Sequence, residues 1–269
     1  MVHAVRTPPD AEIAAPEFPG GLEWLNVSFL RMQTELGRHA ILIEFWDYAR
    51  INSLRTLPYL EAWHERYSQL GLRVVGVHCP GYSFGRERTA VERAVERLGI
   101  DYPVALDPEF EVWRLYGNQG WPARYLFDRA GWLRFMHYGE GEYLGTELAI
   151  QELLREIEPE LALPPPMRPL RTEDVPGVQM EPQTADIALP ADRERLELVR
   201  DWTDGPDYIE AADAGAGAAV KSFRAGSAWA VLSGAVEPGV YEAPAAVVEA
   251  ADPGLRLHGF QFTPLAPGG

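Results

Sequence analysis

The chain contains 269 residues, of which 46% are hydrophobic and 24% are charged. These proportions are typical of globular proteins and exclude collagen, coiled coil and wholesale disorder. The 40 acidic residues outnumber the 24 basic ones, and the formal net charge is −16. Because nucleic acids and most membrane surfaces are also negative, we expect no general binding to either.

The sequence carries no signal for membrane insertion or export. No apolar run approaches the ~18 residues that a membrane-spanning helix needs. The first eighteen residues carry acids and prolines in place of a basic start and an apolar stretch. A secretory signal has the opposite pattern, so the default expectation is a cytoplasmic protein.

Cysteine and histidine content limits the available chemistry. Cys79 is the only cysteine, so one chain holds no internal disulfide, two-cysteine redox cycle or multi-thiolate metal site. The six histidines form no cluster with metal-ligand spacing. We therefore expect neither a metal site nor a cofactor.

The first 160 residues alternate between short apolar runs and amphipathic stretches. Continuous apolar runs predict buried strands, and apolar residues at helical spacing predict helices. Strands followed by helices, and then a hairpin and a last helix, predict an α/β fold with a mixed central sheet flanked by helices. The predicted strands are 40–46, 72–78, 123–127 and 132–136, and the predicted helices are 54–70, 88–98 and 145–157.

Composition changes after about residue 160. Residues 161–184 are rich in proline and predict a stiff, extended linker. Beyond them, short apolar runs separated by Gly and Asp turns predict a small all-β sandwich of jelly-roll-like type. The predicted organisation is a domain at 1–160, a linker at 161–184 and a second domain at 185–269. The runs are 196–199, 218–223, 228–232, 246–249 and 255–262.

Six stretches in the first domain carry a resemblance to a known family: 19–26, 44–55, 75–78, 100–107, 121–128 and 139–143. In this order they resemble the thioredoxin superfamily, in particular its TlpA-like and DipZ-type extracytoplasmic domains. The resemblance implies a thioredoxin-like fold and thiol-disulfide chemistry. It also implies an extracytoplasmic location as the alternative to a cytoplasmic one. Residues 185–269 resemble the carbohydrate-binding-module-like domain that follows in the same proteins.

The chain departs from this family at the redox motif. The family places a Cys-x-x-Cys where the first strand turns into a helix, and the helix N-terminus stabilises the thiolate. Alignment puts Arg50 on the first cysteine and Ser53 on the second. An arginine side chain is no nucleophile and serine is not redox active, so the sequence predicts that the dithiol reaction is absent.

Other parts of the family site are retained. Glu44 falls on the position of the buried acid beneath the active site. Trp121 and Pro122 fall on the cis-proline loop, whose backbone pairs with extended peptides in the family. We predict that Trp46, Arg50, Trp121 and Pro122 bind an extended peptide or a small anionic ligand.

Several interpretations remain open. Arg50 is predicted to pair with Glu44 or Asp47, to bind an anion, or to be a solvated surface side chain. The main hypothesis is a binding or structural module that is not an enzyme. One alternative is oxidoreductase or antioxidant activity through Cys79, which also fits a buried structural residue. Another alternative is glycan or envelope binding through residues 185–269. The sequence predicts no oligomeric state.

Overall fold

The computed structural model describes residues 5–6 and 13–266, and they group into two compact units. The first unit comprises Met1–Asp47, Asn52–Cys79 and Val91–Pro176. The second comprises Tyr48–Ile51, Pro80–Ala90 and Gly177–Gly269. Two short segments that interrupt the first unit in sequence therefore pack with the C-terminal part of the chain. The predicted domain limits at 160 and 185 stay predictions.

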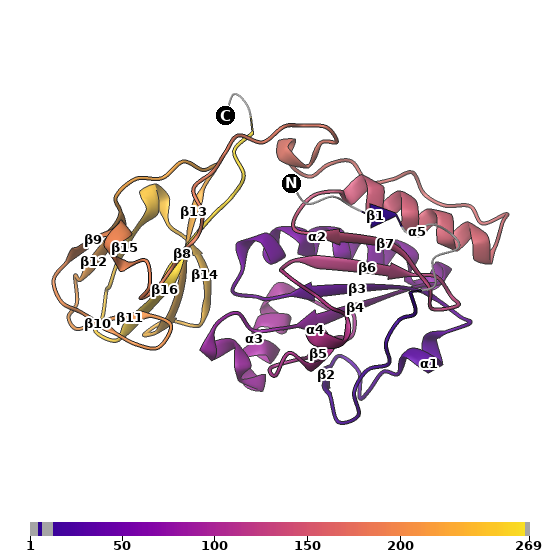
Figure 1. Cartoon of the computed structure of the whole chain (residues 1–269), viewed down its shortest axis with the longest axis horizontal. Coiled ribbons are helices and arrows are strands. Elements are labelled where there is room, and N and C mark those ends of the chain that lie inside the picture. The colour runs from indigo at the N-terminus through magenta and orange to yellow at the C-terminus, as the bar shows by residue number, and fades with distance from the viewer. Residues whose placement is uncertain (1–4, 7–12, 267–269) are drawn as a thin grey trace. The chain divides into compact units, whose positions relative to one another are not determined.

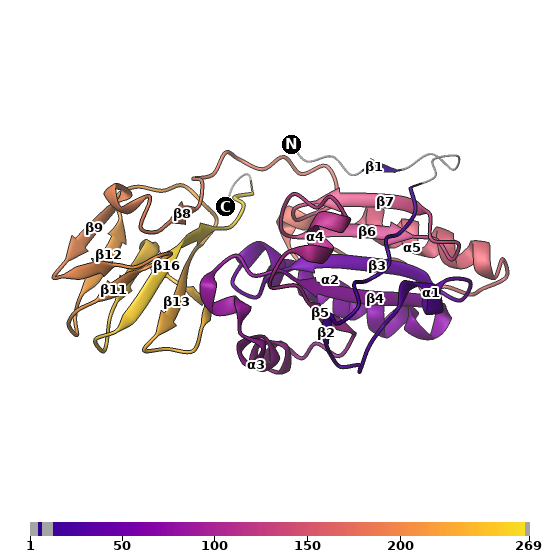
Figure 2. The same cartoon turned by 60° about the horizontal axis from the view of Figure 1, so that its bottom comes forward.

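A mixed sheet of seven strands forms the centre of the first unit, and Figure 2 shows β7, β6, β3 and β4 side by side. Strands β3, β4 and β5 are parallel to one another, whereas β6 pairs antiparallel with both β3 and β7. The central strands are buried on both faces, which explains why their sequences are continuous apolar runs. The sheet order is β1 (Val5–Arg6), β7 (Leu133–Tyr138), β6 (Ala123–Phe127), β3 (Ala40–Trp46), β4 (Leu72–His78), β5 (Val104–Leu106) and β2 (Glu23–Leu25).

Three helices of this part are predicted by the sequence, one with the predicted bounds (88–98) and two with shifted ends, whereas the short helices at 32–35 and 111–115 are not predicted. Helix α2 begins three residues before the predicted start and ends at Tyr67, where a 3₁₀ turn leads to Gly71 with a positive φ of 107°. A glycine adopts this left-handed conformation without a Cβ clash, so the helix stops there. The helices are α1 (Met32–Glu35), α2 (Ile51–Tyr67), α3 (Arg88–Leu98), α4 (Glu111–Leu115) and α5 (Tyr143–Ile157).

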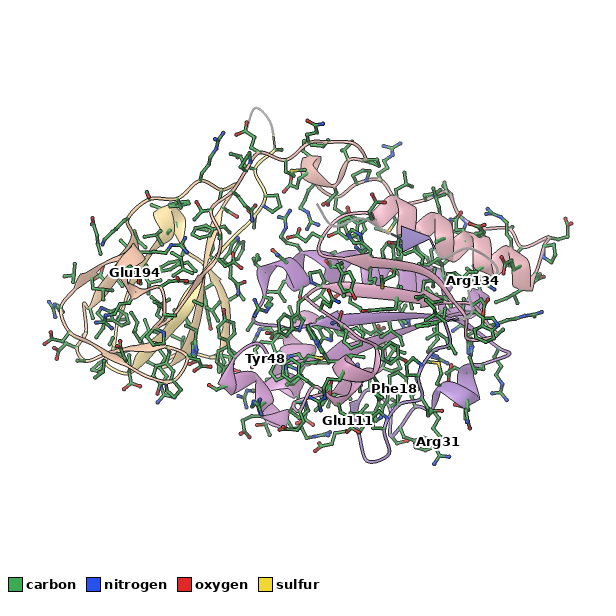
Figure 3. The ribbon with its side chains drawn as sticks, in the orientation of Figure 1. Phe18, Arg31, Tyr48, Glu111, Arg134 and Glu194 are labelled. Carbon is green, nitrogen blue, oxygen red and sulfur yellow. The ribbon has the colours of Figure 1, made fainter. Side chains whose placement is uncertain are left out.

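The two faces of this sheet differ in character. One face packs an apolar cluster that includes Ile43 and Phe45 from β3 and Val112 from α4. Phe18, which Figure 3 labels, joins this cluster. Its ring lies 5.1 Å from that of Trp24. The side chains of even-numbered residues in β3 point to the opposite face because strand side chains alternate.

Helices α2 and α5 pack against each other on the opposite face. The Tyr59 and Tyr143 rings stack with centroids 3.7 Å apart, and the Tyr67 hydroxyl donates to Glu147 at 2.6 Å. Leu57, Leu60, Trp63 and Tyr67, at the predicted helical spacing, are all buried.

Among the described residues, no helix combines the length and apolar character that crossing a bilayer requires. The cytoplasmic and extracytoplasmic alternatives both stay predictions.

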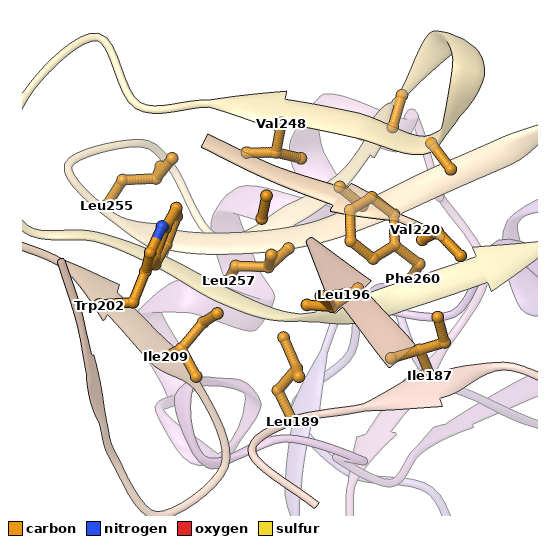
Figure 4. Packing of buried hydrophobic residues seen from close by; sticks show 14 of the residues in the cluster. Ile187, Leu189, Leu196, Trp202, Ile209, Val220, Val248, Leu255, Leu257 and Phe260 are labelled. Carbon is orange, nitrogen blue, oxygen red and sulfur yellow. The ribbon is translucent and has the colours of Figure 1, made fainter. Parts of the chain in front are cut away.

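The second unit contains two antiparallel sheets that share one hydrophobic cluster (Figure 4). Leu196 and Val248 reach the cluster from the three-stranded sheet, and Leu257 and Phe260 reach it from the larger one. The β-rich character predicted for this part is confirmed, whereas its jelly-roll topology and its likeness to a carbohydrate-binding module stay predictions. The strands are β8 (Ile187–Ala188), β9 (Leu196–Val199), β10 (Trp202–Asp204), β11 (Ile209–Ala211), β12 (Gly217–Val220), β13 (Ala228–Gly234), β14 (Gly239–Glu242), β15 (Val247–Glu249) and β16 (Leu255–Phe262).

Candidate functional site

Ser53 lies in the first turn of α2, directly after the strand-to-helix corner. Its side chain is fully buried, and its Oγ accepts a hydrogen bond from the backbone N–H of Asp47 at 3.2 Å. This bond ties the end of β3 to the start of the helix. In this structure Ser53 therefore stabilises the corner through a backbone contact, as serines near helix starts commonly do.

Arg50 is half-buried and immediately precedes α2. Its guanidinium carbon lies 5.7 Å from the centroid of the Tyr82 ring, which is within the range of a cation–π contact. Burial raises the pKa of Asp186, and the positive charge of Arg50 offsets part of this rise. Arg50 thus contacts the Tyr82 ring and interacts electrostatically with the Asp186 carboxylate, and both residues belong to the second unit.

Glu44 and Arg124 lie side by side in the interior of the sheet. The two residues lie opposite each other in neighbouring antiparallel strands, β3 and β6. Arg124 Nε lies 3.7 Å from Glu44 Oε2, and both side chains are buried. Arg124 also donates to Thr146 Oγ1 at 3.2 Å and to the Gly141 carbonyl at 2.5 Å. The partner of the predicted buried acid is therefore an arginine from the next strand of the sheet.

The environment of Glu44 favours its protonated form. Burial raises the pKa of its carboxyl group to about 8, and the nearby charge of Arg124 limits the rise. Neither carboxylate oxygen accepts a hydrogen bond from the part of the chain that the structure describes. A carboxylate without donors loses its main stabilisation when it leaves water, so burial outweighs the single arginine.

Trp46 lies on the same face of the sheet as Glu44 and is fully buried. Its ring centroid is 5.3 Å from that of His78, with the rings edge to face. Its indole nitrogen would lie 2.9 Å from a Cβ placed on Gly76, so only glycine fits at that position without a shift. A direct contact between Trp46 and a ligand would require this packing to open, and its predicted binding role stays a prediction.

Cys79 follows β4 and is buried. Its Sγ lies 3.4 Å from Asp107 Oδ2, and the same carboxylate accepts the backbone N–H groups of Glu111, Val112 and Trp113 at the start of α4. Burial and the negative charge of Asp107 raise the pKa of the Cys79 thiol well above its usual range. A thiol in this setting is protonated at neutral pH, whereas the reactive form is the thiolate.

We expect Cys79 to react slowly with alkylating agents at neutral pH in the folded protein. Iodoacetamide labelling followed by mass spectrometry should be at least about a hundredfold slower than in the urea-unfolded chain, since burial and a raised pKa both suppress the thiolate. Labelling of the folded chain at the rate of the unfolded one would contradict the structural interpretation of Cys79.

The structure brings Trp121 and Pro122 together with Cys79. The Trp121–Pro122 peptide bond is cis. The indole Nε1 of Trp121 donates to the Cys79 carbonyl at 3.0 Å, and the Pro122 carbonyl accepts from Gly139 N at 2.7 Å. The Trp121 ring packs 4.5 Å from that of Trp113 and remains partly exposed. Hydrogen bonds to Cys79 and Gly139 thus hold the loop in place. Its ligand-binding role stays a prediction.

Arg124 and His137 belong to this site but are not predicted by the sequence. Arg124 stands within an apolar strand, and a charge in that position signals a buried partner. Burial and the charge of Arg124 lower the pKa of His137 to about 4, so this imidazole is neutral at physiological pH. Among residues 5–6 and 13–266, no group of three or more His, Cys, Asp and Glu side chains is arranged to hold a metal ion.

Comparison with known proteins finds relatives that match about half to two thirds of the chain. No family model matches the sequence. The chain is 36% identical over 173 residues to Protein DipZ of Mycobacterium tuberculosis, and the match covers 63% of this chain and 25% of DipZ. It is 27% identical over 143 residues to the thiol-disulfide oxidoreductase YkuV of Bacillus subtilis, covering 53% of this chain and 95% of YkuV.

The solved structures that are similar include a solution structure of a thioredoxin-like protein in the oxidised form, with a TM-score of 0.49 and 24% identity. That match covers 54% of this chain and 97% of the other. The chain spans only a quarter of the length of the DipZ proteins it matches. The chain is thus similar in sequence to DipZ proteins and to the thiol-disulfide oxidoreductases YkuV and ResA.

Proposed function

We propose that this chain is a thioredoxin-like binding module that does not run a dithiol cycle. The observation that carries the proposal is that Arg50 and Ser53 lie at the strand-to-helix corner, where the resemblance to the thioredoxin superfamily predicts two cysteines. Disulfide exchange requires a thiolate to attack and a second thiol to resolve the mixed disulfide. Neither group is available at this corner.

The contacts of Ser53 and Cys79 support this proposal. Ser53 is buried and accepts a backbone hydrogen bond, which is a structural role. Cys79 is buried beside the Asp107 carboxylate, which disfavours its thiolate. The loop at Trp121 and Pro122 remains as the part of the family site that could bind a ligand. Its position suits an extended peptide.

Peptide binding is expected to depend on Trp121. A partly exposed tryptophan that packs on Trp113 and Phe110 offers a large rigid surface, and such residues dominate binding energies when they line a site. The probe is the insulin B chain with its thiols carboxamidomethylated, titrated by calorimetry. We expect the Trp121→Ala variant to bind it at least about tenfold more weakly than the wild type.

The matched control is Trp132→Ala. Trp132 is also partly exposed, but it lies beyond the other end of β6, in the turn to β7. This variant should bind the peptide as the wild type does. Equal affinities of the wild type and Trp121→Ala, or loss of binding in Trp132→Ala alone, would refute the proposed role of this loop.

A redox function is the second candidate, because YkuV and ResA are named thiol-disulfide oxidoreductases. In this chain such chemistry would have to pass through Cys79. The slow alkylation expected for Cys79 separates the two candidates, since a working thiol must reach its substrate. Glycan binding by residues 185–269 has no contact in its favour and stays a prediction.

A further inference from the structure

A proline-rich segment that follows α5 contacts both α2 and α5 within the first unit. Residues 164–170 of this segment read Pro-Pro-Pro-Met-Arg-Pro-Leu. Consecutive prolines favour an extended backbone, and proline has no N–H group to donate. Between residues 164 and 170, backbone N–H groups are therefore available only from Met167, Arg168 and Leu170.

The first two carbonyl groups of the segment accept hydrogen bonds from two long side chains. Gln151 Nε2 on α5 donates to the Pro164 carbonyl at 2.8 Å. The Arg66 guanidinium on α2 donates to the next carbonyl, that of Pro165. Gln151 is buried, so this bond satisfies a donor that reaches little water. The two helices thus present donors where the segment offers only acceptors.

Farther along the segment, the donor and acceptor roles are reversed. The N–H of Met167 donates to Glu147 Oε2 on α5 at 2.8 Å, and the N–H of Leu170 donates to the Tyr59 hydroxyl on α2 at 2.8 Å. Glu147 and Tyr59 are both buried. The helices therefore place acceptors opposite N–H groups of non-proline residues, and the order of the partners follows the order of the prolines.

Other hydrogen bonds hold these partners in a fixed orientation. The Tyr67 hydroxyl accepts from Gln151 Nε2 at 2.8 Å and donates to Glu147 Oε1 at 2.6 Å. Groups that are already oriented lose less entropy when a ligand binds. We use the term α2–α5 surface for the four side chains that contact the backbone of the segment: Tyr59, Arg66, Glu147 and Gln151.

Polar contacts also attach the end of the segment. Arg55 Nη2 on α2 donates to Glu173 Oε1 at 2.9 Å, and Arg171 Nη2 donates to the Arg55 carbonyl at 2.9 Å. The Tyr59 hydroxyl donates to Asp174 Oδ2 at 2.8 Å. Since the Arg171 side chain is engaged in this way, a protease that cleaves after arginine reports whether the segment is attached.

The segment adds little to the apolar core of the unit. Residues 161–176, all of which the structure describes, are half-buried or exposed, and Leu170 is 51% exposed. A segment with few buried apolar contacts opens at a lower free energy than a core element does. Its attachment depends on polar contacts to its backbone, as in the binding of an extended peptide.

We propose that the α2–α5 surface is a binding site for extended, proline-containing polypeptide segments, and that residues 164–174 of this chain occupy it as an intrachain ligand. Four side chains bind four main-chain groups of this ligand. A tethered ligand has an effective concentration on the order of millimolar, so it excludes a free peptide of the same sequence. The surface shares no residue with the loop at Trp121 and Pro122, so the inference goes beyond the proposed function.

The first test measures tryptic cleavage after Arg171 in the full chain. Tyr59→Phe keeps the ring and removes the hydroxyl that contacts Leu170 and Asp174. We expect the bond after Arg171 to be cut at least about tenfold faster than in the wild type, since two hydrogen bonds are lost and the detached segment is the cleavable form. The control is Tyr116→Phe, whose hydroxyl bonds the Pro16 carbonyl instead. Equal cleavage of Tyr59→Phe and the wild type would overturn the inference.

The second test measures binding of a free peptide to the surface. In the double variant Met167→Pro with Leu170→Pro, the segment loses both N–H donors while the α2–α5 surface keeps its side chains. The probe is a fluorescent synthetic peptide with the sequence of residues 161–176, titrated by fluorescence anisotropy. We expect the double variant to bind this peptide at least about tenfold more tightly than the wild type, because its own segment no longer competes.

The matched control probe is the same peptide with proline at the positions of Met167 and Leu170. It should bind the double variant at least about tenfold more weakly than the native peptide does, since it lacks the two N–H groups. Equal affinities of the double variant and the wild type for the native peptide, or binding to neither, would overturn the inference. A cooperative thermal transition verifies that each variant is folded.

Discussion

The free energy of unfolding of the wild type is expected to fall as the pH rises from about 4.5 to about 8, and the Glu44→Gln variant is expected to show a smaller fall. Burial raises the pKa of this carboxyl group from 4.5 to about 8 in the folded protein. Within that window the folded state binds a proton that the unfolded state has released, so the free energy of unfolding falls with increasing pH. A displacement of this size corresponds to at most about 5 kcal/mol.

The glutamine variant isolates this effect because its carboxamide resembles the protonated acid and does not titrate. Urea unfolding at several pH values between 4 and 9 should show a smaller decline for Glu44→Gln than for the wild type. Glu65→Gln, an exposed site on α2, should keep the wild-type pH dependence. Parallel pH profiles of the wild type and Glu44→Gln would show that Glu44 is ionised normally in the folded protein.

Introducing two cysteines at the corner should create thiol-disulfide activity. In the double variant Arg50→Cys with Ser53→Cys, the first thiol immediately precedes α2 and the second lies in its first turn. The helix N-terminus lowers the pKa of a thiol at the first position, and the spacing lets the second thiol resolve a mixed disulfide. We expect the oxidised variant to contain an intrachain disulfide, detected as a mass loss of two hydrogens.

The single variant Arg50→Cys is the matched control for this experiment. It has the attacking thiol without the resolving one, so it should form mixed disulfides and fail to turn over. Ser53→Cys also removes the hydrogen bond from the Asp47 N–H, at a cost of about 1 kcal/mol. A double variant that folds but forms no disulfide would show that the alignment of Arg50 and Ser53 with the cysteine motif is wrong.

Local sequence patterns predict the longer strands and helices of the first unit, but not β2, β5, α1 and α4, because each pattern depends on neighbours within a few residues. The apolar run at 40–46 and the spacing of Leu57, Leu60 and Trp63 needed no knowledge of the rest of the chain. The start of α2 was placed three residues late because the apolar stripe begins after its first turn. The partner of Glu44 was not identified, since Arg124 lies eighty residues away and strand order decides the pairing.

The contacts of residues 164–174 had no signal in the sequence. A run of prolines predicts an extended backbone, but it does not indicate which groups that backbone binds. Tyr59 lies 111 positions before its partner Leu170, and Arg66 lies 99 positions before its partner Pro165. Only the structure describes these contacts.

The most direct test of the central claim compares disulfide reduction by the wild type and by the variant Arg50→Cys with Ser53→Cys in one insulin assay with dithiothreitol. The wild type is predicted to match the rate of dithiothreitol alone, and the double variant to exceed it at least about tenfold. Turnover by the wild type clearly above that background, abolished in Cys79→Ala, would contradict the account, because it would show that this chain carries out thiol chemistry without the corner dithiol.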